Sequence, residues 1–201
     1  MRAETMTLLI ASNNKHKIEE IKAVLEGKFD RITTLDEEGI VCDPEETGET
    51  FYENALIKAH TVAKYTNKAV LADDTGLCVS ALGGRPGVHS ARYADELTHK
   101  KNGHDSTANR RKVLSELKNA TDRSAYFQTV IVLLYPDGKI VTGEGKVEGR
   151  ILESEHGSNG FGYDCIFYST ELNKTFAEAT TAEKLIVSHR SRALQDLMTK
   201  I

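Results

Sequence analysis

The chain has 201 residues, of which 39% are hydrophobic and 28% charged, and its formal net charge is −4. This composition is typical of an ordinary globular protein and excludes a fibrous or disordered chain. The length and the absence of a linker predict a single domain spanning residues 1–201. A negative net charge predicts no nucleic-acid partner, because binding to DNA or RNA regardless of sequence needs a basic surface.

The chain has no feature of a membrane or secreted protein. Its longest apolar run, residues 130–135, is far shorter than the roughly 20 residues of a membrane-spanning helix. We therefore expect a cytoplasmic protein with no membrane partner. Cys42, Cys78 and Cys165 are far apart and form no C-x-x-C pair, which indicates packing residues rather than a disulfide framework or a zinc site.

The first third of the chain predicts two strands and two helices. Residues 7–11 have the apolar character of a short strand, and residues 31–35 are a candidate second strand. A polar turn over 12–14 separates the first strand from a helix that ends at Gly27. After an acidic loop comes a helix over 51–65 with an apolar stripe at helical spacing, preceded by a capping box at Thr50 and Glu53.

The middle of the chain predicts further strands. Residues 70–72 are apolar enough for a buried strand, and 77–82 for another, with the doublet Asp73-Asp74 between them at a strand end. Residues 83–87 contain three glycines and a proline and predict a loop.

The second half predicts a helix over 109–117 and then a long hairpin, with strands over 124–135 and 139–148 joined by the turn Pro136-Asp137-Gly138. A glycine-rich loop over 157–164 follows, and a helix closes the chain near Lys200. These elements indicate an α/β protein with mixed α+β character, built on a mixed, twisted sheet flanked by helices. Ligands in such folds bind beyond strand ends.

The polar turn after the first strand is a candidate anion site. Backbone N–H groups at the start of a helix, together with nearby lysines, can hold a phosphate. The alternative is a simple helix N-cap with a solvated basic turn. The chain has no P-loop, and residues 157–162 lack the spacing of a dinucleotide-binding motif. The candidates are Ser12, Asn13, Asn14, Lys15, His16 and Lys17.

The doublet Asp73-Asp74 is a candidate metal site. Adjacent carboxylates repel each other unless a cation or hydrogen-bond donors neutralise them. Mg²⁺ prefers few protein carboxylates together with water and phosphate oxygens, so the doublet with Glu46 suits a metal–triphosphate complex. The alternative is that Asp74 caps a tight turn. Asn54 and Lys58 share one face of the helix over 51–65, either for binding or as an ordinary solvated face.

Two segments in the second half are candidate base-binding sites. In the loop 157–164, glycines allow close approach to a flat ligand and Phe161 and Tyr163 offer stacking, although a hairpin with packed aromatics is the alternative. In a continuous C-terminal helix, His189 would be a core residue. If Ser188 instead caps a new helix, His189 and Arg190 open its first turn and face a ligand, and we favour this interpretation.

Taken together, these blocks resemble the inosine triphosphate pyrophosphatase family over nearly the whole chain. The matching motifs are Ser12–Asn14 with Lys17; Glu46–Gly48, Thr50, Phe51, Asn54, Ala55, Lys58 and Ala59; Ala72–Leu77; Pro86–Val88 with Ser90–Tyr93; Gly160–Asp164; and Lys184 with Ser188–Arg190. The resemblance implies a two-lobed α/β fold with a long sheet and an active-site cleft between the lobes, Mg²⁺ as cofactor and a homodimer.

The resemblance also implies roles for individual residues. Asp74 corresponds to the proton acceptor that also contacts the metal, with Lys58 beside it and Glu46 and Asp73 completing the acidic side. Residues 12–17 would bind the triphosphate, with Lys184 adding charge. Positions corresponding to base contacts are Phe161, Gly162, Tyr163, Asp164, His189 and Arg190, and Thr75 stands where many relatives have serine.

The sequence departs from the family's pattern at two other places. Cys165 replaces a proline that commonly follows the Tyr-Asp pair, which loosens that backbone and could alter the base pocket. Residues 1–5 precede the family's usual first strand, so Met6 is a candidate start.

The expected activity is hydrolysis of the noncanonical purine nucleoside triphosphates ITP, dITP and XTP to the monophosphate and pyrophosphate. The alternatives are a pyrophosphatase for pyrimidine or modified nucleotides and a binding module without turnover. A haloacid-type phosphatase is excluded, because Asp73-Asp74-Thr75-Gly76 lacks the D-x-D spacing.

Overall fold

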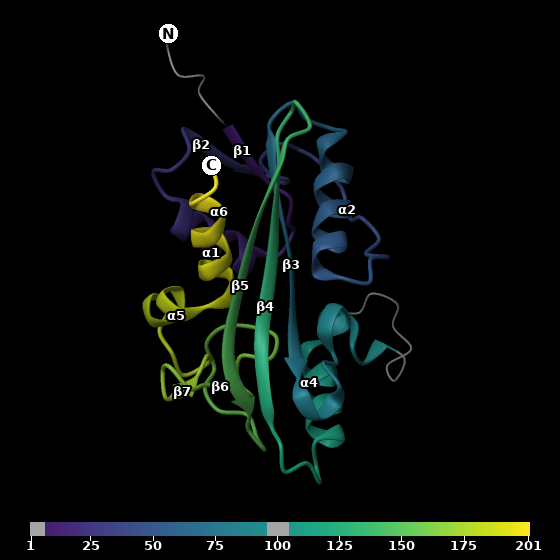
Figure 1. Cartoon of the computed structure of the whole chain (residues 1–201), viewed down its shortest axis with the longest axis vertical. Helices are drawn as coiled ribbons and strands as arrows, with labels where there is room; N and C mark the ends of the chain where they lie inside the picture. The colour runs from purple at the N-terminus through teal and green to yellow at the C-terminus, as the bar shows by residue number, and fades with distance from the viewer. Residues whose placement is uncertain (1–6, 96–104) are drawn as a thin grey trace. The chain divides into compact units, whose positions relative to one another are not determined.

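The computed structural model describes residues 7–95 and 105–201. Its strands form one seven-stranded sheet in the order β2-β1-β3-β4-β5-β6-β7 (Figure 1). The chain divides into two compact units. The first unit contains residues up to 74 with 129–145 and 190–201, and the second unit contains 75–128 and 146–189. Met6, the candidate start, lies outside the described residues.

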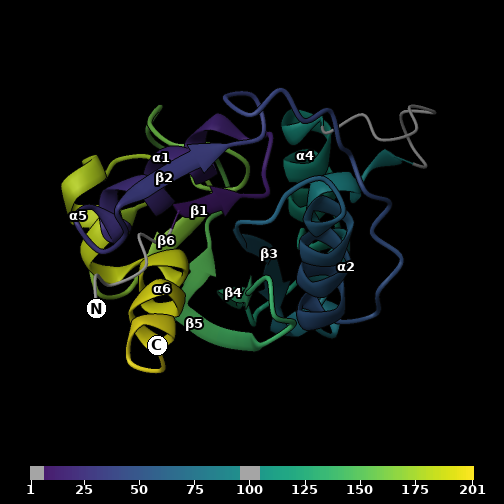
Figure 2. The same cartoon turned by 90° about the horizontal axis from the view of Figure 1, so that it is seen from above.

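The first unit has helices on both faces of its strands. Strand β1 (Thr7–Ile10) pairs in parallel with β2 (Arg31–Thr34) and with the beginning of β3 (Ala69–Val79). Figure 2 shows α2 (Phe51–Ala63) on one side of these strands and α6 (His189–Met198) on the other. The strand prediction for this region is confirmed.

Alternating side chains of the strands build two separate cores in the first unit. Leu8 and Ile10 of β1 pack with Ile21 and Leu25 of α1 (Lys15–Leu25) and with α6. Leu9 and Ala11 point the other way and pack with the apolar stripe of α2. The predicted capping box at the start of α2 is present, with Thr50 accepting from the Glu53 N–H at 3.1 Å.

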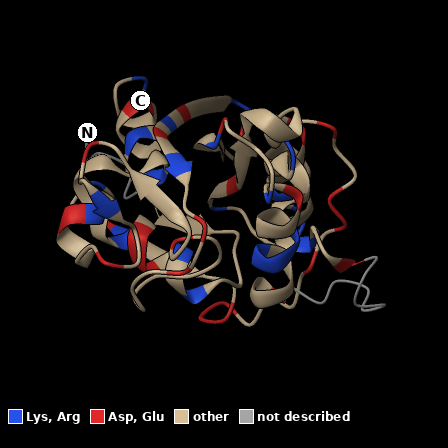
Figure 3. Cartoon of the chain, turned by 90° about the horizontal axis from the view of Figure 1, so that it is seen from below, with Lys and Arg blue, Asp and Glu red and all other residues tan. Residues whose placement is uncertain are grey.

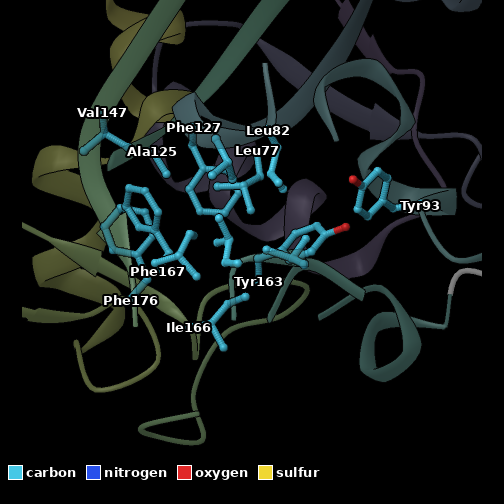
Figure 4. Packing of buried hydrophobic residues seen from close by; sticks show 14 of the residues in the cluster. Leu77, Leu82, Tyr93, Ala125, Phe127, Val147, Tyr163, Ile166, Phe167 and Phe176 are labelled. Carbon is cyan, nitrogen blue, oxygen red and sulfur yellow. The ribbon is translucent and has the colours of Figure 1, made fainter. Parts of the chain in front are cut away.

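In the second unit, aromatic and aliphatic side chains pack together in a core (Figure 4). The predicted hairpin is confirmed as β4 (Ser124–Leu134) and β5 (Ile140–Ile151), and both strands extend through the two units. Phe127 of β4 packs on Phe167 of β6 (Phe167–Ser169), with ring centroids 4.6 Å apart. Phe176 follows β7 (Lys174–Thr175) and packs on the same ring. Helix α4 (Ser106–Glu116) contributes Val113.

One prediction about the sheet is wrong. Asp73 and Asp74 do not mark a strand end or a turn, because β3 continues without a break from Ala69 to Val79. The expected strand over 77–82 is therefore the end of β3 followed by the short 3-10 helix Ser80–Leu82. A second 3-10 helix covers Gly87–Arg92. Charged residues can occupy the middle of a buried strand here because each is paired with a cation.

The C-terminal segment confirms the break at Ser188. Helix α5 (Thr181–Val187) ends at Ser188, whose backbone is extended, and α6 begins at His189. The alternative of one continuous helix is therefore wrong. The helix α5 has its own capping box, between Thr180 and Glu183. Among the described residues, none of the helices has the length and apolar character needed to cross a membrane.

Candidate active site

The two carboxylates of the doublet lie on opposite faces of β3. Side chains alternate along a strand, so Asp73 follows Ala69 and Leu71 on the face that packs with α1 and α6. Asp74 follows Val70 and Ala72 on the face that packs with α2. The carboxylates of the two aspartates therefore have different hydrogen-bond and ion-pair partners.

Asp74 is held by side chains from α2. Lys58 Nζ donates to Asp74 Oδ1 at 2.8 Å, and Asn54 Nδ2 donates to Asp74 Oδ2 at 3.4 Å. Glu46 approaches the same lysine, with its Oε1 2.6 Å from Lys58 Nζ. Asn54 and Lys58 thus form part of a buried polar cluster, and the alternative of a solvated helix face is excluded.

The loop before α2 places Glu46 beside this cluster. Figure 3 shows acidic residues along this loop. At its end, the Gly48 N–H donates to Asn54 Oδ1 at 2.8 Å. A Cβ added at Gly48 would lie 2.6 Å from Glu53 Cβ and 2.7 Å from Asn54 Oδ1, so only glycine fits against the helix there. The turn therefore fixes the approach of the chain from Glu46 to α2.

Burial sets the protonation behaviour of Asp74. It raises the pKa of this carboxyl above the ordinary value of 3.8, and the nearby Lys58 and Lys17 only partly oppose the rise. A carboxylate with a raised pKa is a better proton acceptor than an exposed one. Asp74 therefore has the chemistry of a general base.

Asp73 has a different environment and a different chemistry. Its Oδ2 lies 3.0 Å from Lys17 Nζ, and Arg190 donates to the same oxygen from Nε and Nη2, each at 3.2 Å. Arg190 also donates to Glu20 of α1. Burial disfavours the charge of Asp73, but Lys17 and Arg190 outweigh it and hold the pKa well below its usual range. This aspartate is a permanent anion that positions two cations.

The predicted anion-binding turn lies between β1 and α1. Asn14 is the N-cap of α1, and its Oδ1 accepts from the N–H groups of His16 and Lys17 at 3.1 and 3.3 Å. Asn13 Nδ2 donates to the Cys42 carbonyl at 3.0 Å, which ties the turn to the loop leading to Glu46. The capping interpretation is therefore confirmed, and the side chains of Lys15 and His16 are exposed. Ser12 Oγ accepts from the Asn14 N–H at 3.2 Å.

The second unit assembles the predicted base-binding residues around Asp164. Its Oδ2 accepts from Lys184 Nζ at 2.7 Å and from the Phe161 N–H at 2.9 Å. Lys184 Nζ also lies 4.9 Å from the centroid of the Phe161 ring. A Cβ at Gly160 would lie 2.1 Å from Asp164 Oδ2, so a side chain there would displace this carboxylate. Phe161, Asp164 and Lys184 are thus one connected group.

The remaining predicted residues of the second unit are more buried. Tyr163 is 5% exposed and belongs to the core, and its hydroxyl donates to the Ser90 carbonyl at 2.7 Å. His189 stacks on Phe127, with centroids 4.7 Å apart and 16° between the ring planes. Tyr163 is therefore a packed aromatic residue and His189 a core residue, which were the alternatives given for them from the sequence. Thr75 is half-buried and follows Asp74 in β3, and Gly162 has a φ of 61°.

Two residues of these networks were missed by the sequence interpretation. Glu20 lies three positions after Lys17 on α1, and a carboxylate at that helical spacing was the available signal. Arg110 donates from Nη1 to the Gly162 carbonyl at 2.9 Å. No local pattern marks the contact of Arg110 with the loop 157–164, because Glu155 and Gly162 are 45 and 52 positions away in the chain.

The carboxylate oxygens of Glu46 and Asp74, which flank Lys58, are suitable ligands for a hard divalent cation. Glu46 and Asp74 offer carboxylate oxygens near one point, and Mg²⁺ usually takes one or two protein carboxylates and fills its other positions with water and phosphate oxygens. Within residues 7–95 and 105–201, no group of three or more His, Cys, Asp and Glu side chains is arranged to hold a metal. Asp73, on the other face of β3, contacts Lys17 and Arg190 instead.

This fold and this site define an α/β protein equipped to bind and hydrolyse a phosphorylated ligand. Residues 8–200 match the Ham1 family. The dITP/XTP pyrophosphatase of Leuconostoc mesenteroides is 47% identical over 201 residues, which cover 98% of this chain and 96% of that protein. That of Bacillus subtilis is 47% identical over 191 residues, covering 94% of this chain and 93% of the relative.

Solved structures agree with the sequence matches. The Staphylococcus aureus Ham1 protein aligns with a TM-score of 0.83 and 42% identity, covering 96% of this chain and 97% of that chain. A HAM1 protein from Coxiella burnetii aligns with a TM-score of 0.84 and 40% identity, covering 97% and 98%. The chain belongs to the Ham1 family, and the family resemblance inferred from the sequence is confirmed.

Proposed function

We propose that the protein hydrolyses noncanonical purine nucleoside triphosphates, namely ITP, dITP and XTP, to the nucleoside monophosphate and pyrophosphate. Relatives that match almost the whole chain are named dITP/XTP pyrophosphatases, which supports this substrate class. The main structural support is the buried Asp74 carboxylate, held by Lys58 beside Glu46. That arrangement supplies a base, a cation and further metal-binding oxygens at one point.

In the proposed reaction, Asp74 accepts a proton from the attacking water. The water oxygen bonds to one phosphorus of the α–β anhydride, and the bond from that phosphorus to the bridging oxygen breaks. The electron pair stays on the bridging oxygen of the leaving group, so the products are the nucleoside monophosphate and pyrophosphate. Lys58 orients Asp74 through the bond at 2.8 Å and keeps it ionised. Glu46 and Asp74 would hold Mg²⁺, which when bound offsets phosphate charge and orients the phosphate oxygens.

The basic residues of the first unit are proposed to bind the triphosphate. Lys17 lies close to the start of α1, where backbone N–H groups and the helix dipole also favour an anion. Ser12, Asn13, Asn14, Lys15 and His16 complete this turn. Asp73 and Glu20 position Lys17 and Arg190 rather than binding the metal, in view of their contacts.

The base contacts are proposed to come mainly from the second unit. Phe161 offers a ring for stacking, while Gly162, Tyr163 and Asp164 shape the loop and Lys184 adds positive charge. Donors of His189 and Arg190 would pair with a 6-oxo group. The 6-amino group of ATP would face a donor and leave both unpaired, which costs several kcal/mol on a typical scale and disfavours ATP.

Four further features belong to the same proposal: dependence on Mg²⁺, a homodimer, a cytoplasmic location without nucleic-acid or membrane partners, and a single functional domain over residues 1–201. Family membership supports these features.

The test is pyrophosphate release with Mg²⁺ from ITP, XTP, dITP, GTP, ATP and UTP, using the wild type and Asp74→Asn. We expect rapid turnover of the first three substrates and a loss of about 10²- to 10⁴-fold in kcat in the variant. Glu45→Gln, at an exposed neighbour of Glu46, is the matched charge control and should keep full activity. Added EDTA should abolish turnover.

Other outcomes would point to other functions. Preferential hydrolysis of UTP would indicate a pyrimidine or modified-nucleotide enzyme. Binding of Mg–ITP without any pyrophosphate release would indicate a binding module, and orthophosphate release would contradict the proposed bond cleavage.

A further inference from the structure

Arg110 connects α4 to the loop proposed to contact the base. Its Nη1 donates to the Gly162 carbonyl at 2.9 Å, within the loop 157–164. Its Nε donates to Glu155 Oε1 at 2.7 Å, just before the loop begins. A further bond joins Nη2 to Thr107 on the same helix at 3.3 Å. One guanidinium therefore joins a regular helix to the near end and the far part of this loop.

The loop needs such an external anchor because its own backbone is permissive. Gly157, Gly160 and Gly162 all have positive φ, and none of them has a side chain to restrict the backbone. Gly162 lies between Phe161 and Tyr163, so its peptide orientation sets the direction of both rings. A displacement of about 1 Å in such a contact can cost a large factor in substrate use.

Other hydrogen bonds hold the loop 157–164 at Asn159, Tyr163 and Asp164, but not at the Gly162 carbonyl. Tyr163 is fixed through the Ser90 carbonyl at 2.7 Å, and Asp164 through Lys184. Asn159 donates to the Ala179 carbonyl at 3.2 Å. The Gly162 carbonyl accepts its bond from Arg110 of α4. The guanidinium fork suits this task because it can bind a carboxylate and a carbonyl in fixed directions, which the single ammonium of lysine cannot do.

We propose that Arg110 is a positioning residue for base recognition: by bonding Glu155 and the Gly162 carbonyl it holds the loop 157–164 in the form that selects the purine. The proposal rests on the proposed function, in which this loop contacts the base. Arg110 acts through the loop and takes no part in the phosphate chemistry, whose residues belong to the first unit.

The kinetic test uses Arg110→Leu, Arg110→Lys and Glu155→Gln, with Arg111→Leu as control, since Arg111 is an exposed arginine on the same helix. For dITP and XTP, Arg110→Leu should raise KM roughly tenfold and leave kcat within about twofold of the wild type. The preference for XTP over GTP in kcat/KM should fall. Arg110→Lys should recover part of the loss, and Arg111→Leu should behave as the wild type.

A second measurement tests, without substrate, whether the bonds of Arg110 to Glu155 and the Gly162 carbonyl hold the loop in place; we call this pair of bonds the clamp. Hydrogen exchange of the nucleotide-free protein should speed up in peptides covering 155–164 for Arg110→Leu, and remain unchanged in peptides from β1 and α2. Unaltered exchange in that loop would overturn the clamp itself. Faster exchange with unaltered KM and unaltered selectivity would overturn the link to base recognition, as would an equal loss for every nucleotide through kcat.

The two levels of the proposal can fail separately. If the wild type hydrolyses none of the purine triphosphates, the proposed function fails and the assignment to base recognition fails with it. Hydrogen exchange then still decides whether Arg110 orders the loop. If the wild type is active and selective while Arg110→Leu keeps its KM and its selectivity, only the role of Arg110 is refuted.

Discussion

Asp73 and Asp74 are neighbours with opposite chemistry because a strand directs them to opposite faces. Asp73 has two cationic partners and a pKa well below its usual range, whereas burial raises the pKa of Asp74. A carboxylate with a lowered pKa stays ionised at neutral pH and is suited to hold cationic groups in place. A carboxylate that accepts a proton readily is suited to act on water.

The first prediction concerns the structural role of Asp73. Asp73→Asn removes the carboxylate partner of Lys17 and one of the two carboxylate partners of the buried Arg190, and breaking a buried ion pair typically costs about 3–5 kcal/mol. For a chain of this size, that lowers Tm by about 6–20 °C at pH 7. Calorimetry checks the result, with the exposed Asp36→Asn as control. An unchanged Tm would refute the assigned role.

This stabilisation also has a defined pH dependence. The pKa of Asp73 is lower in the folded state than in the unfolded one, so the unfolded chain binds the proton first as the pH falls. The contribution is complete above the unfolded pKa of about 3.9 and is lost progressively below it. The difference in Tm between wild type and Asp73→Asn should therefore shrink below about pH 4.

The second prediction concerns Lys58, whose charge opposes the raised pKa of Asp74. The variant Lys58→Met lacks the cation that lies 2.8 Å from Asp74 Oδ1, so the pKa of Asp74 should rise further. In the proposed mechanism activity requires the ionised Asp74 carboxylate, so the acid limb of the kcat/KM profile should shift to higher pH. Lys58→Arg, which keeps the charge, should leave the limb near its wild-type position. An identical limb in all three proteins would exclude Asp74 as the titrating base.

Residue type predicted that Asp73-Asp74 belongs to a functional site. It did not predict that the two carboxylates lie on opposite faces of one strand. The sequence interpretation placed Asp73-Asp74 at a strand end, whereas the structure has them inside a buried strand, where charged residues are rare. The two lysines and the arginine that neutralise them come from α1, α2 and α6, over 100 positions away in the case of Arg190. Pairing at such distance leaves no local signal.

At the scale of elements, prediction succeeded where the pattern is strong. Helix α2 has a capping box and an apolar stripe, and the β4–β5 hairpin has a Pro-Asp-Gly turn between long runs. Strands β6 and β7 were missed, because segments of three and two residues are too short for any periodicity. The sheet order likewise depends on contacts that the local sequence does not contain.

The third prediction tests the packing of α6 on β5. A Cβ at Gly143 would lie 2.2 Å from the Ala193 carbonyl oxygen and 2.8 Å from the Leu197 backbone nitrogen. Both are backbone atoms of α6 and cannot rotate away, so Gly143→Ala must displace the helix. We expect a loss of about 1–3 kcal/mol in unfolding free energy by denaturant titration. The adjacent, exposed Glu144→Ala should lose less than 0.5 kcal/mol, on the usual scale for surface changes. Equal stability of both variants would contradict this packing.

At the scale of the whole molecule, the two units share three strands. The division falls inside β3 between Asp74 and Thr75, and β4 and β5 also contribute residues to both units. Each unit has its own apolar packing, with two clusters in the first and one in the second, as two domains would. Because β3, β4 and β5 each continue from one unit into the other, a strand cannot keep its structure in one unit if it unfolds in the other. We therefore predict one cooperative unfolding transition for the chain.

Core substitutions in the two units distinguish this prediction from independent unfolding. Leu71→Ala in the first unit and Phe176→Ala in the second each remove a fully buried side chain, at a typical cost of about 2–5 kcal/mol. Calorimetry should show that each variant shifts the same single peak to lower temperature, while Ile186→Ala, at a residue 73% exposed, leaves it in place. Two peaks, each moved by only one core variant, would mean that the units fold separately. A single peak follows from the strand sharing, because loss of either core removes the order of strands on which the other core is built.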